Sequence, residues 1–155
     1  MAARKILIVD DEKDILTLFS TVLESHGYSV TTAMTARDAL AKNQAAYHNL
    51  ALLDIGLPDM QGTDLLRKMR ISNPDMIIIM ITGNPELKTA INAINYGADG
   101  YIVKPVSSKD LVATIEKKLR FQEEAHQLTD EKVSAWLESR LSRLDLENTR
   151  QQRLD

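Results

Sequence analysis

The stretch KILIVDDEKD, residues 5–14, joins an apolar run to adjacent carboxylates. Ile6 to Val9 are four consecutive apolar residues, and Asp10 and Asp11 follow them directly. A short apolar run of this kind is typical of a buried strand. A turn needs one Asp at most, and neighbouring like charges repel each other. The acidic pair therefore indicates a chemical role at the end of the first strand.

Short apolar runs alternate with longer amphipathic stretches as far as about residue 120. Apolar residues at helical spacing predict helices, with Thr35 as one N-cap and Ser107 opening a capping box. Gly27 and Gly97 are expected to end two of these helices. Five strands alternating with five helices predict an α/β fold with a parallel sheet that is covered on both faces. The expected strands are 6–9, 28–33, 50–53, 76–81 and 101–103.

The composition limits the class of protein. The 155 residues, 44% apolar and 26% charged, suit one globular domain with an extension. A net charge of -3 provides no field that would draw the chain to nucleic acid or to an anionic membrane. Cysteine is absent, which excludes disulfides and fits a reducing compartment. The longest apolar run, residues 76–81, is too short to span a bilayer. We therefore expect a soluble, cytoplasmic protein without direct membrane or nucleic-acid binding.

Polar residues stand where the expected strands end: Asp10 and Asp11, then Asp54, Thr82 and Lys104. Ligands of parallel α/β sheets bind beyond the carboxyl ends of the strands, so these side chains are expected to converge. Carboxylates about 4 Å apart repel by a few kcal/mol, which favours a bound cation such as Mg²⁺. A carboxylate beside Mg²⁺, a lysine and a hydroxyl is equipped to form an aspartyl phosphate.

Four fragments in order resemble the receiver domain of two-component response regulators: ILIVDDE, LLDIGLPDMQG, IMITG and GADGYIVKP. The resemblance covers residues 4 to about 120. It implies a doubly wound, flavodoxin-like sheet with strand order 2-1-3-4-5. Taken singly, each polar residue fits a helix cap, a turn, a strand residue or solvated surface, and only the set favours the receiver.

The resemblance implies a role for each acidic residue of the site. Asp54 takes the place of the phosphoacceptor. Asp10 and Asp11 take the place of the acidic pair that organises Mg²⁺, with Asp11 favoured as the direct ligand. Asp54 and the backbone carbonyl of Gly56 complete the metal site.

The resemblance also implies a group that responds to phosphorylation. Lys104 pairs with the phosphoryl oxygens, and Pro105 matches the family's cis-proline position. Thr82 and Tyr101 resemble the switch pair, in which the hydroxyl moves to the phosphate and the ring turns inward. Asn84, two positions after Thr82, is able to orient water.

Some residues of the predicted receiver depart from the family or play other roles. Gly56 stands where the family more often carries a side chain, and we hypothesise that its absence leaves the acyl phosphate more open to hydrolysis. Pro58 and Gly62 are expected to shape the loop after Asp54. No histidine has metal-ligand spacing, and all three are expected at the surface or at helix ends: His26, His48 and His126.

We divide the chain into a receiver, residues 1–120, and a helical tail, residues 121–155. The tail has no glycine or proline, and Thr129 and Asp130 would cap a separate helix there. It carries a stripe at helical spacing, which either packs on the receiver, stays solvated, or pairs with another copy or a partner. The stripe consists of Val133, Trp136, Leu137, Arg140, Leu141 and Leu144.

The leading hypothesis is a stand-alone receiver that a sensor histidine kinase phosphorylates on Asp54 in a Mg²⁺-dependent reaction. It would catalyse only its own phosphorylation and dephosphorylation, and act on a downstream effector or a second copy through the last receiver helix and the tail. Two alternatives are a shuttle to a His phosphotransfer protein and the receiver of a transcription regulator lacking its DNA-binding domain. An aspartate-nucleophile phosphatase ranks low, because residues 10–12 read Asp-Asp-Glu rather than Asp-x-Asp.

Overall fold

The computed structural model describes residues 3–83 and 86–154 of the chain. Over these residues a parallel sheet of five strands has the order β2-β1-β3-β4-β5, which confirms the predicted fold. The strands are β1 (Lys5–Val9), β2 (Ser29–Ala33), β3 (Leu50–Asp54), β4 (Ile77–Thr82) and β5 (Gly100–Val103). The helices are α1 (Lys13–Ser25), α2 (Ala36–Ala45), α3 (Gly62–Ser72), α4 (Leu87–Asn95) and α5 (Ser108–Leu154).

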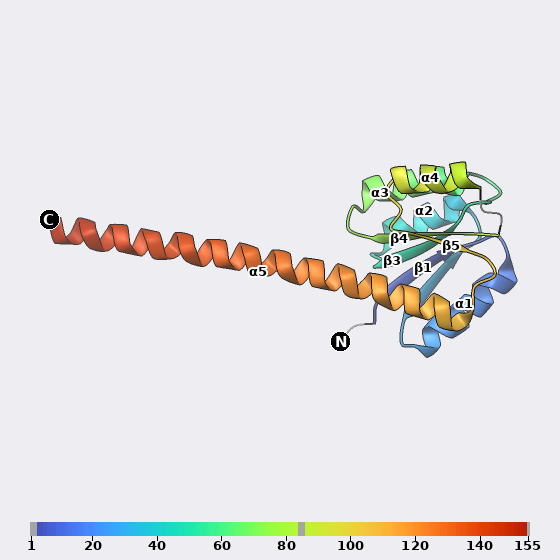
Figure 1. The fold of residues 1–155 in the computed structure, drawn as a ribbon, viewed down its shortest axis with the longest axis horizontal. Helices are drawn as coiled ribbons and strands as arrows, with labels where there is room; N and C mark the ends of the chain where they lie inside the picture. Colours follow the sequence, from blue (N-terminus) through green and yellow to red (C-terminus); the bar gives the residue numbers. More distant parts are fainter. Residues whose placement is uncertain (1–2, 84–85, 155) are drawn as a thin grey trace. The chain divides into compact units, whose positions relative to one another are not determined.

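The sheet lies between two layers of helices (Figure 1). Helices α2, α3 and α4 cover one face, where Leu65, Met69 and Ala93 pack against β1, β3 and β4. Helix α1 and the first turns of α5 cover the other face with Leu23 and Ile115 among their buried residues. The central strand β3 is buried along its whole length, as its continuous apolar run predicts.

Local signals in the sequence set several helix ends as predicted. The Thr35 hydroxyl accepts a hydrogen bond from the Asp38 N–H at 3.1 Å and caps α2. The Ser107 hydroxyl accepts one from the Asp110 N–H at 3.0 Å at the start of α5. Gly27 and Gly97, which follow α1 and α4, have φ values of +89° and +95°. These left-handed conformations favour glycine and stop a helix.

The loop after β3 depends on a close approach of two backbone segments at Gly62. A Cβ atom at this position would stand 2.3 Å from the carbonyl oxygen of Asp54 and 2.6 Å from the Cα of Ile55. The Gly62 N–H also donates to the Ile55 carbonyl at 2.8 Å. Gly62 therefore shapes this loop, as predicted, and lets the start of α3 pack closely against the backbone of Asp54 and Ile55.

A network of hydrogen bonds around Arg70 joins the backbone turns near the start of β4. The Arg70 guanidinium, at the end of α3, donates to the carbonyls of Pro74 and Met76 at 2.9 and 2.7 Å. It also donates to the Gly97 carbonyl at 2.7 Å and pairs with Asp99 at 2.6 Å. One side chain thus fastens the turn after α3 to the turn after α4.

The environment of His48 differs from the prediction of a surface or helix-end residue. Its side chain is buried, and Nε2 lies 3.1 Å from the Thr31 hydroxyl. Burial and the nearby Lys5 charge lower the pKa of His48 below its ordinary value. Composition and spacing do not report this burial, because the contact joins residues from two different segments. His26 and His126 are exposed, as predicted.

The chain divides into two compact units, residues 1–119 and 120–155. The prediction of a separate helix beginning near Thr129 is wrong, because α5 is continuous through this position. The Thr129 hydroxyl donates to the Ala125 carbonyl at 2.9 Å, one turn back, and so does not cap a new helix. Of the described helices, none is long and apolar enough to cross a membrane.

Candidate functional site

Three charged side chains meet beyond the carboxyl ends of β1, β3 and β5. Lys104 Nζ lies 2.8 Å from Asp10 Oδ2 and 3.8 Å from Asp54 Oδ1. Asp10 follows β1, Asp54 ends β3 and Lys104 follows β5, and β1 and β3 are direct neighbours in the sheet. The predicted convergence of these residues is therefore confirmed.

Asp10 is the inner member of the acidic pair. Its side chain is 1% exposed, and its Oδ1 accepts a hydrogen bond from the Glu12 N–H at 2.9 Å. Asp11 is exposed. The two adjacent carboxylates of the opening motif thus have different environments, one inside the site and one at its rim.

Glu12 is an acidic residue that the sequence reading did not select. Single carboxylate oxygens of Asp10, Asp11 and Glu12 lie within 4.8 Å of one another. The sequence signal that could have identified Glu12 is its position directly after Asp10 and Asp11. These donors are hard oxygens, and Mg²⁺ takes such ligands while keeping several waters. The chemistry of these three carboxylates therefore fits a magnesium ion.

Burial and the neighbouring charges shift the pKa values of Asp54 and Lys104. Burial raises the pKa of the Asp54 carboxyl, and the Asp10 charge raises it further, against the opposing effects of Lys104 and the Gly56 N–H. Burial alone lowers the pKa of Lys104, but the hydrogen bond to Asp10 and the nearby carboxylates outweigh it, so the net shift is upward. Lys104 thus stays protonated, and added positive charge at this site would favour the ionised form of Asp54.

Thr82 is buried at the last position of β4 and pairs with Val103 across the sheet. The Lys104 N–H donates to the Thr82 carbonyl at 2.7 Å, which links the ends of β4 and β5. The hydroxyl-bearing residue is therefore placed beside the strand end that carries Asp54, since β3 and β4 are neighbours. Asn84 lies outside the described residues.

Tyr101 lies two residues earlier on β5 than Val103 and pairs with Met80. Its ring packs against the apolar cluster beneath α4. Its hydroxyl is buried and finds no hydrogen-bond partner within the described part of the chain. Burial, together with the Glu86 charge, raises the pKa of this phenol. The Lys104–Pro105 peptide bond is cis, in agreement with the expectation for Pro105.

The loop between β3 and α3 also caps a distant helix. The Asp59 carboxylate accepts hydrogen bonds from the backbone N–H groups of Ala36 and Arg37 at 2.9 and 3.0 Å. These bonds lower the pKa of Asp59. The loop that leaves Asp54 is thereby attached to the start of α2. Sequence reasoning missed this contact, because the partners stand more than twenty positions apart.

The fold and this cluster define a doubly wound α/β domain with a cluster of acidic side chains at the strand ends. The response regulator receiver domain family matches residues 6–116, and the chain belongs to that family.

Two known relatives match about three quarters of the chain. The alginate biosynthesis transcriptional regulatory protein AlgB of Pseudomonas putida is 40% identical over 77% of this chain. The nitrogen assimilation regulatory protein NtrX of Azorhizobium caulinodans is 41% identical over 76%. The aligned region spans about a quarter of each relative, 27% and 26%.

Solved structures show the same fold. A CheY-like response regulator receiver domain from Methanospirillum hungatei has a TM-score of 0.79 and 46% identity. The match covers 80% of this chain and 99% of that one. The structure of NtrX from Brucella abortus in complex with ADP has a TM-score of 0.78 and 33% identity, over 83% of this chain and 30% of its own.

Proposed function

We propose that Asp54 accepts a phosphoryl group from a sensor histidine kinase in a Mg²⁺-dependent reaction, and that the modified receiver changes its protein contacts. The observation that carries this proposal is the position of Lys104, whose ammonium reaches both the buried Asp10 and Asp54. A cation held between two carboxylates at the end of the sheet can stabilise the negative charge of a phosphoryl group that is transferred to one of them.

Asp54 is the nucleophile in this proposal. A carboxylate oxygen attacks the phosphorus of the donor, the bond from phosphorus to the donor's imidazole nitrogen breaks, and the imidazole takes up a proton from water. Asp10 and Asp11, with Asp54 and the Gly56 carbonyl, would hold the metal, and Glu12 borders the same cluster. When bound, Mg²⁺ offsets negative charge on the phosphoryl oxygens.

Lys104 has a different task before and after transfer. It neutralises Asp10 in the unmodified protein, at 2.8 Å. The added phosphoryl oxygens would compete for the same ammonium and draw it from Asp10 towards position 54. Asp10 is almost fully buried, so a weakened pair there leaves a carboxylate that a metal ion is suited to satisfy.

Thr82 and Tyr101 are proposed to transmit the effect of phosphorylation from Asp54 to the surface of the receiver. The Thr82 hydroxyl would bond the phosphoryl oxygens, and Tyr101 would respond from the next strand, where its hydroxyl is already buried. Phosphorylation biases an equilibrium between two states only by the difference in its contacts. The proposed outlets are a downstream effector or a second copy, at the face of the last receiver helix, in the cytoplasm. The chain would turn over no substrate other than its own phosphoryl group.

The test is uptake of a phosphoryl group from acetyl phosphate, measured as intact mass with and without Mg²⁺. The wild-type chain should gain one phosphoryl group only when Mg²⁺ is present, and Asp54→Asn should gain none. Asp59→Asn is the matched control, because it removes a carboxyl from the same loop but outside the charged cluster. Equal uptake by the wild-type and Asp54→Asn chains would refute the proposal.

A further inference from the structure

Two arginines of α3 contact the C-terminal end of the neighbouring helix α4. The Arg67 guanidinium stands 4.9 Å from the ring centre of Tyr96, the C-cap residue of α4. Arg70 donates to the Gly97 carbonyl from Nε at 3.1 Å and from Nη2 at 2.7 Å. A Cβ atom at Gly97 would stand 3.2 Å from the Arg70 Nε, so the arginine packs closely on this turn. Helix α3 thus binds both the backbone and the last side chain of α4 at this end.

The positive charge of these arginines also suits the C-terminal end of a helix. The free carbonyl groups there carry a partial negative charge, which nearby cations stabilise. Helix α4 has no basic residue in its own last turn, so Arg67 and Arg70 supply this charge from α3. The turn that follows is fixed as well, because the Asp99 N–H donates to the Ile78 carbonyl at 2.7 Å and the Asp99 carboxylate pairs with Arg70 at 2.6 Å.

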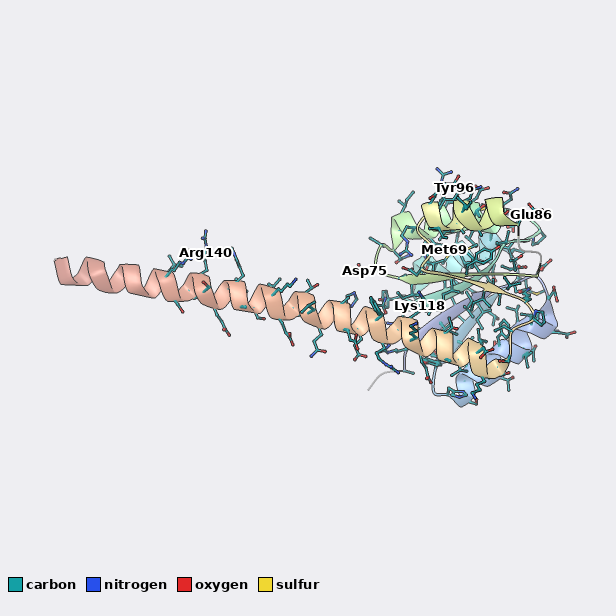
Figure 2. The ribbon with its side chains drawn as sticks, in the orientation of Figure 1. Met69, Asp75, Glu86, Tyr96, Lys118 and Arg140 are labelled. Atoms are coloured by element: carbon teal, nitrogen blue, oxygen red, sulfur yellow. The ribbon has the colours of Figure 1, made fainter. Side chains whose placement is uncertain are left out.

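The N-terminal end of α4 lacks a comparable attachment among the described residues. Figure 2 labels Glu86 and Tyr96, which cap the two ends of the helix. The Glu86 side chain is exposed and makes no capping hydrogen bond, and the first turn contains no acidic residue. Of the α4 side chains that the structure describes, Ala93 alone is buried, and an alanine buries little apolar surface. The contacts of the C-terminal end are therefore the strongest that the described residues give α4.

We propose that Arg67 and Arg70 make the C-terminal end of α4 a fixed pivot, so that the helix opens from its N-terminal end. Local opening starts where the fewest contacts have to break. The N-terminal end is also the end that follows β4, whose last residue is Thr82. Under the proposed function, on which this consequence rests, a change at Thr82 reaches the end of α4 that opens and leaves the turn at Gly97 in place.

The pivot is tested first in the unmodified full-length chain, by hydrogen exchange of single amides measured by NMR. The Ala98 N–H donates to the Ala93 carbonyl at 2.9 Å, and the Ala90 N–H donates to the Glu86 carbonyl at 3.0 Å. Since the two bonds are equally long, a difference in protection reports how often each end opens. After correction for intrinsic rates, the Ala98 amide should exchange roughly tenfold more slowly than the Ala90 amide. Equal protection at the two amides, or slower exchange at Ala90, would overturn the proposal.

The variant Arg67→Ala tests the contact with Tyr96. It should speed exchange at Ala98 by about two- to fivefold, the usual effect of an exposed cation–π contact on an equilibrium, and leave Ala90 unchanged. Lys68→Ala is the matched control and should change neither amide, because it removes an exposed charge from the next position of α3, about 100° around the axis. Tyr96→Leu should match Arg67→Ala, and the double variant should add nothing further, since each change removes the same contact. Equal effects of Arg67→Ala and Lys68→Ala, or additive effects in the double variant, would contradict the proposal.

The consequence for switching is tested on the phosphorylated chain. Acetyl phosphate in excess, with Mg²⁺, keeps Asp54 loaded, and intact mass gives the occupancy. Exchange at Ala90 should change severalfold on loading, whereas exchange at Ala98 should stay as it is in the unmodified chain. No change at Ala90, or an equal change at both amides, would overturn the proposal. A chain that takes up no phosphoryl group contradicts the proposed function instead, and the measurements on the unmodified chain still decide whether the pivot exists.

Discussion

Replacing Gly62 with alanine tests the loop that follows Asp54. Two effects of opposite sign compete at this position. Alanine at the first residue of α3 would favour the helix by up to about 1 kcal/mol. Its Cβ, however, would stand 2.3 Å from the Asp54 carbonyl oxygen and 2.6 Å from the Ile55 Cα, whereas ordinary contact begins near 3.4 Å.

The clash outweighs the gain in helix propensity, so Gly62→Ala should lower the stability. Both neighbours are backbone atoms, which cannot move aside by rotation of a side chain. Overpacking costs about 1–3 kcal/mol, and a shortfall of about 1 Å against backbone belongs at the upper end of that range. We expect a net loss of about 2 kcal/mol, and so a fall in Tm of about 8 °C for a unit of this size. Phosphoryl uptake at Asp54 should fall as well, because the displaced atoms belong to Asp54 itself.

The assay is scanning calorimetry of the receiver transition, because the only tryptophan, Trp136, lies in the other unit and does not report on this loop. Gly56→Ala is the matched control. A Cβ at Gly56 meets nothing within 4 Å, so this variant should keep its Tm or gain slightly from the smaller entropy of the unfolded chain. An unchanged Tm in Gly62→Ala, or an equal fall in Gly56→Ala, would refute the reasoning.

Three further predictions concern the rest of the receiver. Gly56→Met fits the open space at this position and should lengthen the lifetime of the acyl phosphate, timed by loss of label; a lifetime equal to that of wild type would refute the role of Gly56. Arg70→Lys should lower the free energy of unfolding by about 2–4 kcal/mol, nearly as much as Arg70→Ala, because an ammonium cannot span the carbonyls that the guanidinium joins; a Tm close to that of wild type would contradict this. His48 has a lowered pKa in the folded chain, so the unfolded chain binds more protons as the pH falls through about 6.5, and stability should decrease there. His48→Gln should reduce that decrease and the exposed control His126→Gln should not, as read from the Tm on either side of this pH.

The sequence predicted the sheet and the main residues of the site, because both follow from local patterns. Apolar runs located the strands, and the rule that the carboxyl ends of parallel strands share one edge predicts that Asp10, Asp54 and Lys104 lie close together. The helix caps at Thr35 and Ser107 were predictable for the same reason, because each hydroxyl accepts a hydrogen bond from an N–H only three residues ahead.

Contacts between distant segments were not predictable in this way. Periodicity and turn signals report how one segment folds, and they do not report which side chain of another segment it meets. The Arg70 network, the Asp59 bonds to α2 and the burial of His48 all join residues of separate elements. Thr129 shows the reverse case, because a residue suited to cap a helix instead bonds the preceding turn of a continuous one.

The most direct test of the central claim is to locate the phosphoryl group on the chain. After incubation with acetyl phosphate and Mg²⁺, borohydride reduction converts an aspartyl phosphate to homoserine, which peptide mass spectrometry assigns to a position. The account predicts homoserine at Asp54 alone, and none when Mg²⁺ is withheld. Homoserine at Asp10 or Asp11, or its absence throughout the chain, would contradict it.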